Sequence, residues 1–159
     1  MEKLDLAGNI RQLDRFDRQI IAILSADGRL PVTDLAKRIG MSKSPCQSRV
    51  KRLQEDGYIL GFRAVLNPHK LGREHVAFTE VTLSDTREAA LKAFNAAVQK
   101  VPEIEQCHMI AGSCDYLLKI RTADILAYRK ILGETITTLP HVSNTSTSVS
   151  MEAVKDFAF

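Results

Sequence analysis

The sequence predicts an α+β protein built from two small domains, and three observations support that class. Apolar residues recur at helical spacing in three short segments of the first half, whereas the second half alternates strand-like and helical segments. The composition, 45% hydrophobic and 26% charged, is typical of a folded chain. The charge divides along the chain: residues 1–73 hold 14 Lys/Arg and 8 Asp/Glu, a net +6, and residues 74–159 hold 8 and 11, a net −3. The two halves are therefore expected to face different partners.

Two short helices are predicted near the start of the basic half. The first begins after Asp14, a favourable N-cap, carries Asp17 in its first turn and ends before residues 27–28. Its apolar residues at helical spacing are Phe16, Ile20, Ile23 and Leu24. The second helix spans about 31–39, and Gly40 stands where helices commonly end.

A third helix has the clearest start signal. Ser44 is the expected N-cap, Pro45 the first helical residue, and Gln47 completes a capping-box pattern. Gly57 ends this helix. The apolar face holds Cys46, Val50 and Leu53. The opposite face, at about 100° per residue, holds Gln47, Ser48, Lys51, Arg52 and Glu55.

The second and third helices, with a tight turn at 40–42, form a predicted helix-turn-helix. Residues 35–54 include six basic residues and no acidic one. The aromatic and β-branched segment 58–65 is expected to add a wing strand. We therefore predict a winged helix-turn-helix DNA-binding domain over 13–66, preceded by a tail over 1–12. A basic helical face that is merely solvated is the competing interpretation.

The chemistry of the third helix divides its polar residues into two roles. Side chains able to make directional hydrogen bonds to base edges are Gln47, Ser48 and Arg52. Those expected to hold phosphates of double-stranded DNA are Ser42, Lys43, Ser44 and Lys51. For Arg49, at the border of the apolar face, a structural ion pair and a phosphate contact remain equal alternatives.

The second half, 74–159 after a turn-rich linker at 67–73, predicts the order βαββαβ. The expected elements are a strand over 76–83, a helix over 85–101, a hairpin of strands 104–110 and 116–121, a helix over 125–139 and a strand over 142–154. This order is that of the ferredoxin-like fold, an antiparallel sheet with two helices on one face. The other face must also be buried, so at least a homodimer is expected.

Several functional classes find no support. The histidines and the three cysteines lack metal-ligand spacing, and no nucleophile or phosphate-binding motif occurs, so neither an enzyme, a cofactor nor a metal site is predicted. The thiols are expected to be structural, with a redox role for Cys107 and Cys114 as the alternative. No long apolar run or secretory signal is found, so a cytoplasmic protein without membrane contact is expected.

Taken in order, the motifs of the chain resemble those of the Lrp/AsnC (leucine-responsive/asparagine-regulator, or feast-famine) family of transcription regulators. These motifs are Leu13-Asp14-x-x-Asp17, Asp27-Gly28-Arg29, Leu35-Ala36-Lys37-Arg38, Met41-Ser42-x-Ser44-Pro45, Arg49-Val50-Lys51-Arg52-Leu53, Gly57-x-Ile59 and Ala64-Val65-Leu66-Asn67-Pro68. The second half is similar to the RAM domain of that family. The resemblance implies dimers that assemble further, often to octamers, and an amino-acid effector held between dimers.

By the same resemblance, the effector contacts carry over to Gly112 and Asp115 of the hairpin and to Thr145 and Thr147 of the final strand. Many relatives have an acidic and an aromatic residue where this chain has Ser113 and Cys114, so the ligand identity does not carry over. A turn cap at Asp115 and a positive-φ turn position at Gly112 are the structural alternatives.

Two functions thus compete. One is an effector-responsive, sequence-specific regulator, and the other is an architectural protein that organises DNA and has no effector. A ligand that shifts DNA affinity favours the first, and salt-sensitive binding with little sequence preference favours the second.

Overall fold

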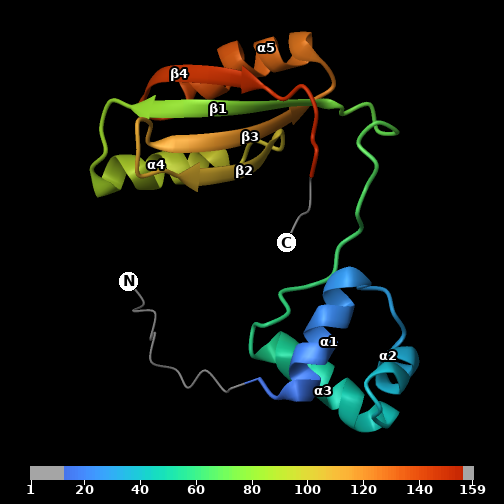
Figure 1. The fold of residues 1–159 in the computed structure, drawn as a ribbon. Helices are drawn as coiled ribbons and strands as arrows, with labels where there is room; N and C mark the ends of the chain where they lie inside the picture. The colour runs from blue at the N-terminus through green and yellow to red at the C-terminus, as the bar shows by residue number, and fades with distance from the viewer. Residues whose placement is uncertain (1–12, 156–159) are drawn as a thin grey trace. The chain divides into compact units, whose positions relative to one another are not determined.

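The computed structural model describes residues 13–155, so the predicted tail at 1–12 and the last four residues of the predicted second domain lie outside the described residues. The chain divides into two compact units, the first ending at Val65 and the second beginning at Leu66 (Figure 1). Among the described residues, no helix has the length and apolar character needed to cross a membrane.

Three helices make up the first unit: α1 (Arg15–Ala26), α2 (Val32–Arg38) and α3 (Lys43–Glu55). α1 begins as predicted, because the Asp14 carboxylate accepts from the Asp17 N–H at 2.9 Å and the Asp17 carboxylate accepts from the Asp14 N–H at 3.3 Å. Gly40, just beyond α2, has φ 70° as expected of a helix C-terminus. The core that joins the three helices consists of Ile20, Leu24, Leu35, Ala36, Ile39, Cys46 and Leu53.

The predicted start of α3 was wrong by two residues. Ser42, with extended backbone angles of φ −74° and ψ 157°, is the N-cap in place of Ser44, and its side chain makes no capping hydrogen bond. Ser44 and Pro45 therefore lie inside the first turn. Proline is tolerated there because the first amides of a helix have no partner within the helix.

The wing strand predicted over 58–65 was also wrong. Tyr58 and Ile59 pack on the three-helix core, and the Ile59 N–H donates to the Leu53 carbonyl at 3.0 Å. From Leu60, which is 96% exposed, the chain runs on to residue 65 without pairing to any strand among residues 13–155. β-propensity alone cannot form a strand, because the ladder needs a neighbour.

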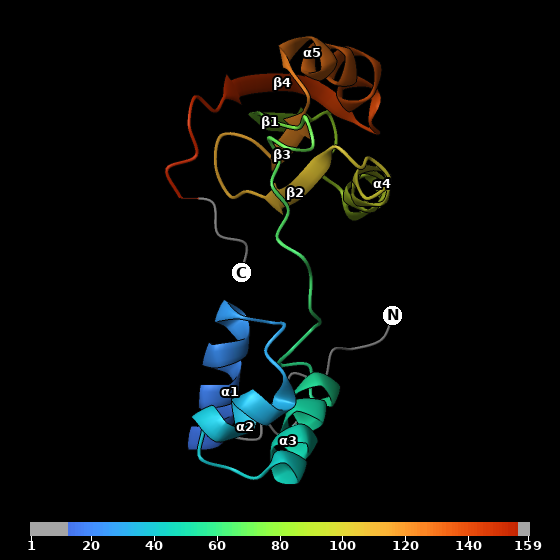
Figure 2. The ribbon, with the colours of Figure 1, turned by 90° about the vertical axis from the view of Figure 1, so that its right-hand side faces the viewer.

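The second unit contains one antiparallel four-stranded sheet and two helices. In chain order its elements are β1 (His75–Leu83), α4 (Glu88–Val98), β2 (Ile104–Met109), β3 (Tyr116–Thr122), α5 (Ile125–Glu134) and β4 (Val142–Val149). The strand order is β2-β3-β1-β4, and both helices lie on the same face of the sheet (Figure 2). The predicted βαββαβ ferredoxin-like fold is confirmed.

Three predicted elements of this unit were clearly too long. The helix predicted over 85–101 is α4, which spans only Glu88–Val98. The helix predicted over 125–139 is divided into α5 and a 3₁₀ turn (Ile136–Thr138). The strand predicted to reach residue 154 ends at Val149, which lies opposite Ala77. Because β1 begins at His75, only two residues before Ala77, residues 151–155 have no neighbouring strand within the described part of the chain with which to continue the ladder.

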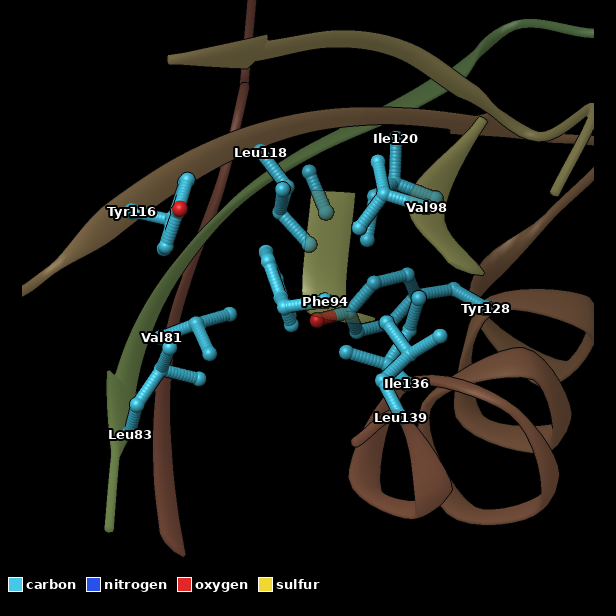
Figure 3. Close-up of a cluster of buried hydrophobic side chains, with 11 residues drawn as sticks. Val81, Leu83, Phe94, Val98, Tyr116, Leu118, Ile120, Tyr128, Ile136 and Leu139 are labelled. Carbon is cyan, nitrogen blue, oxygen red and sulfur yellow. The ribbon is translucent and has the colours of Figure 1, made fainter. Parts of the chain in front are cut away.

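The core of this unit lies between the sheet and its two helices. Figure 3 shows side chains of β1 and β3 directed towards those of α4, α5 and the 3₁₀ turn. The rings of Phe94 and Tyr116 meet at 4.4 Å between centroids. This packing holds the β2–β3 hairpin and β4 in fixed positions relative to β1.

Candidate nucleic-acid interface and effector site

The solvent-facing surface of α3 carries six of the seven residues predicted to contact DNA. Cys46 and Leu53 are buried on the opposite side of the helix, so the two faces separate as its periodicity predicts. The six exposed residues, which we call the α3 polar face, are Ser42, Lys43, Ser44, Gln47, Ser48 and Lys51. Lys51 forms an exposed i, i+4 pair with Glu55 at 3.5 Å, which water and phosphate can displace at little cost.

Arg52, the seventh predicted residue, does not join that face. Its Nη2 lies 2.6 Å from both carboxylate oxygens of Asp17 on α1. Arg49 reaches the same carboxylate at 2.8 Å and that of Asp14 at 2.6 Å. The ion-pair alternative for Arg49 is therefore the arrangement that the structure shows, and Arg52 shares it.

Within the cluster formed by Asp14, Asp17, Arg49 and Arg52, two pKa values are shifted. The Asp17 backbone N–H, and then the Arg49 guanidinium, lower the pKa of Asp14, while burial opposes that shift. The hydrogen bonds from Arg49 to Asp14 and Asp17 raise the pKa of Arg49. Both residues therefore stay ionised at neutral pH, and the cluster remains a set of charge-assisted contacts.

Sequence reasoning missed Asp17 as a partner of the two arginines, although a signal was present. Asp17 recurs with Ile20 and Leu24 at helical spacing, and all three are buried. A carboxylate on the apolar stripe of a helix must find a cation or donors, because an unpaired buried charge is costly. Arg49 and Arg52, one turn apart on α3, were the matching pair.

In the second unit, Asp115 is tied into the sheet where the hairpin enters β3. Its carboxylate accepts from the Leu83 N–H at 2.7 Å, and its own N–H donates to the Val81 carbonyl at 3.0 Å. These bonds give Asp115 a structural role, but Leu83 stands 32 residues earlier on β1, so they link two strands and are not the local turn cap of the alternative. The positive-φ alternative for Gly112 is wrong, because its φ lies outside that region, and a Cβ built there would meet Ile110 Cγ2 at 3.4 Å.

Thr145 and Thr147 lie on β4, directly opposite Val81 and Thr79 of β1. The register places Thr145 and Asp115 at the same end of the sheet, on either side of Val81. The Thr147 hydroxyl is 2.6 Å from that of Tyr128, which in turn is 2.9 Å from the hydroxyl of Thr79. The four predicted effector residues thus come from two segments that β1 separates.

The remaining chemistry-bearing groups form no second centre. Within residues 13–155 no three His, Cys, Asp or Glu side chains are grouped closely enough to hold a metal ion. Cys46, Cys107 and Cys114 are free thiols. Burial raises the pKa of Cys46 and Cys107, which disfavours the reactive thiolate and favours a structural role for these two.

Comparisons with known proteins agree with both units. A model of the winged helix-turn-helix DNA-binding domain matches residues 13–59, and one of the Lrp/AsnC ligand binding domain matches residues 76–158. A proline dehydrogenase transcriptional activator from Rhizobium radiobacter is 64% identical, over 91% of this chain and 92% of the relative. A protein of the same name from Rhodobacter capsulatus is 53% identical, over 89% and 92%. The leucine-responsive regulatory protein of Escherichia coli K12 is 48% identical, over 91% and 88%.

Solved structures give the same result. A transcriptional regulator from Neisseria meningitidis in complex with L-Met has a TM-score of 0.86 and 30% identity, over 91% of this chain and 94% of that one. A feast or famine regulatory protein from M. tuberculosis complexed with L-methionine has a TM-score of 0.84 and 32% identity, over 91% and 96%. The relatives are regulators of transcription and not enzymes. With both of its domains matched in order, this chain belongs to the Lrp/AsnC family of DNA-binding transcriptional regulators.

Proposed function

We propose that this chain activates transcription of a proline dehydrogenase gene in response to an amino acid, with L-proline as the first candidate. The observation that carries the proposal is identity: 64% and 53% to two activators of that gene, against 48% to the leucine-responsive protein of Escherichia coli. A regulator of an amino-acid-degrading enzyme works best when it senses the substrate of that enzyme. The chain would thus couple proline supply to proline breakdown.

DNA is read by the α3 polar face. Gln47 and Ser48 are exposed in the N-terminal half of the helix, the part that a recognition helix presents to base edges. Lys43, Ser44 and Lys51 are placed to hold phosphates on either side of them. The Ser42 hydroxyl, which caps no amide of its own helix, stands at the positive end of the helix dipole and adds a phosphate donor.

The effector is held by Gly112, Asp115, Thr145 and Thr147. Only one Asp115 oxygen is used by the Leu83 amide, so the other can accept from an α-ammonium group. The backbone angles of Gly112 do not require glycine. The absence of a side chain there is instead consistent with a ligand that approaches the main chain closely. Two structural neighbours were solved with L-methionine, which supports an amino acid as the class of ligand.

Assembly completes the site. The sheet face away from the helices exposes Phe78 of β1, which is 37% accessible. A sheet with helices on only one face leaves apolar area that a second copy can cover. We therefore propose a homodimer that assembles further, up to an octamer, and brings β4 of one copy towards the hairpin of another.

The test measures DNA affinity and ligand response together. Fluorescence anisotropy would compare the region upstream of the proline dehydrogenase gene with a shuffled duplex, with and without L-proline, L-leucine and L-methionine. We expect preference for the upstream region and a change with proline. Equal affinity for both duplexes, combined with no thermal shift by any of the twenty amino acids, would replace the proposal with the architectural function.

A matched pair of variants tests the reading face. Gln47 and Gln54 are both exposed and, seven residues apart, lie on the same side of α3, but only Gln47 lies in the N-terminal half that a recognition helix presents to base edges. Gln47→Ala should weaken binding to the preferred duplex by about 1–3 kcal/mol, the value of one bidentate base contact. Gln54→Ala should leave the affinity unchanged. Equal effects of the two substitutions would remove Gln47 from the reading surface.

A further inference from the structure

Asp17 is a carboxylate on the apolar stripe of α1. Its side chain is only 4% exposed and stands in line with Ile20 and Leu24 in the three-helix core. Aspartate is rarely so buried unless it is paired, because losing water around a charge is costly. A group that is kept there despite this cost is expected to contribute something that an apolar residue would not.

Two arginines of the recognition helix saturate this carboxylate. Arg52 Nη2 lies 2.6 Å from each oxygen, and Arg49 Nη1 lies 2.8 Å from Oδ1. Arg49 also bonds Asp14 at 2.6 Å and places its guanidinium 5.5 Å from the centre of the Phe16 ring. The N-terminal turn of α1 is thus joined to α3 at two points one helical turn apart.

The hydrogen bonds from Arg49 and Arg52 to Asp17 fix the rotation of α3 about its axis, which apolar packing alone leaves free. Cys46 and Leu53 hold α3 against the core, but non-directional contacts tolerate small rotations and slides of a helix. Side-chain tips lie about 5–6 Å from a helix axis, so a rotation of about 10° moves them by about 1 Å. A shift of that size breaks a hydrogen bond to a base edge.

We propose that Asp17 is the positioning residue of the recognition helix, and that it acts through Arg49 and Arg52 to set the rotation at which the α3 polar face meets DNA. In this arrangement Arg52 does not read bases. Its guanidinium remains on Asp17 while Gln47 and Ser48 face the groove.

A substitution that changes the charge of Asp17 distinguishes a positioning role from direct DNA binding by Arg52. Asp17→Asn removes a negative charge close to the DNA-binding surface and releases Arg52. If Arg52 served DNA directly, this substitution would leave binding unchanged or make it tighter. Under our proposal it weakens binding, despite the favourable change in charge, because the helix loses its fixed rotation.

The experiment uses the full chain and a duplex selected by the wild-type protein from a random library, so it does not depend on the identity of the target gene. Asp17→Asn and Arg52→Met should each weaken binding to the selected duplex by about tenfold or more, the loss expected for one misaligned base contact, with little change on shuffled DNA. The double variant should lose no more than either single variant. Asp56→Asn, an exposed charge removed at the end of α3, is the control and should not weaken binding.

A second measurement covers the case in which Asp17→Asn fails to fold. Arg52→Lys keeps the charge, but its side chain is shorter than that of arginine, so the ammonium falls short of the position from which Nη2 reaches both Asp17 oxygens. It should therefore weaken selective binding while the salt dependence of affinity stays at the wild-type slope. Tighter binding by Asp17→Asn, additive losses in the double variant, or a slope reduced by about one in Arg52→Met would assign Arg52 to DNA and overturn the proposal.

Discussion

Replacing Asp115 with alanine removes the acceptor of the Leu83 amide, which its carboxylate binds at 2.7 Å. Leu83 is buried, so its N–H would be left without a partner, at a cost of about 1–3 kcal/mol. The two backbone bonds of Asp115, to Val81 at 3.0 Å and from Ile110 at 2.8 Å, survive the substitution. A loss of about 2 kcal/mol in a unit of this size lowers its Tm by roughly 8–16 °C.

Thermal unfolding followed by circular dichroism measures this change, with two companion variants. Asp115→Asn keeps an oxygen acceptor and should recover part of the loss. Ser113→Ala, an exposed substitution in the same hairpin, should leave the Tm unchanged. If Asp115→Ala kept the wild-type Tm and lost only the amino-acid response, the structural role derived from the Leu83 contact would be refuted, and Asp115 would serve the effector alone.

The remaining predictions concern packing, backbone and titration. Leu118→Ala, at a fully buried site of β3, should lower the free energy of unfolding in urea by about 2–5 kcal/mol. Leu126→Ala, at a site 71% exposed on α5, should lower it by less than about 0.5 kcal/mol, and equal losses would contradict the core assignment. Gly40→Ala should destabilise the folded chain by about 1–2 kcal/mol. The cost is one of backbone conformation, because φ at Gly40 is 70° and no atom stands within 4 Å of the new Cβ. Gly40→Asn should cost less, and an alanine variant as stable as the wild type would exclude backbone strain as the reason for glycine here. Hydrogen bonds from Arg87 lower the pKa of Asp85 from 3.8 to about 2. The pair therefore stabilises the folded chain above about pH 4, and this contribution disappears as the pH falls towards 2. A carboxyl NMR titration should show an Asp85 pKa of about 2 in the wild-type chain and a pKa closer to 3.8 in Arg87→Met.

Local signals predicted the parts of the fold that depend on neighbours in sequence. Asp14 and Asp17 stand three residues apart and form the expected capping box, and Gly40 takes the expected backbone angle after α2. The prediction for α3 failed by two residues, because Ser42 and Ser44 are equally good caps by composition and the path of the chain through the turn chooses between them. The order βαββαβ was readable because each element carries its own period.

In the candidate sites, too, the features that depend on local spacing were predicted and those that depend on distant contacts were not. The exposure of the α3 polar face follows from helical periodicity, so Gln47 and Ser48 were placed correctly on the surface by pattern alone. Arg52 was assigned to that face as well, because periodicity places it opposite the apolar residues of α3 and says nothing of which groups of α1 lie within reach of its side chain. Its partner stands 35 residues earlier in the chain.

The sequence by itself determined the class of the fold, the order of its elements, the basic and acidic halves and the surface of the recognition helix, because these depend on spacing, capping and charge within short segments. Only the tertiary structure decided that Asp17 holds Arg49 and Arg52, that Asp115 caps β1, and that residues 58–65 find no strand to pair with among the described residues. Each of these depends on which distant group the packed helices and strands bring within hydrogen-bonding distance, and a one-dimensional pattern does not contain that distance.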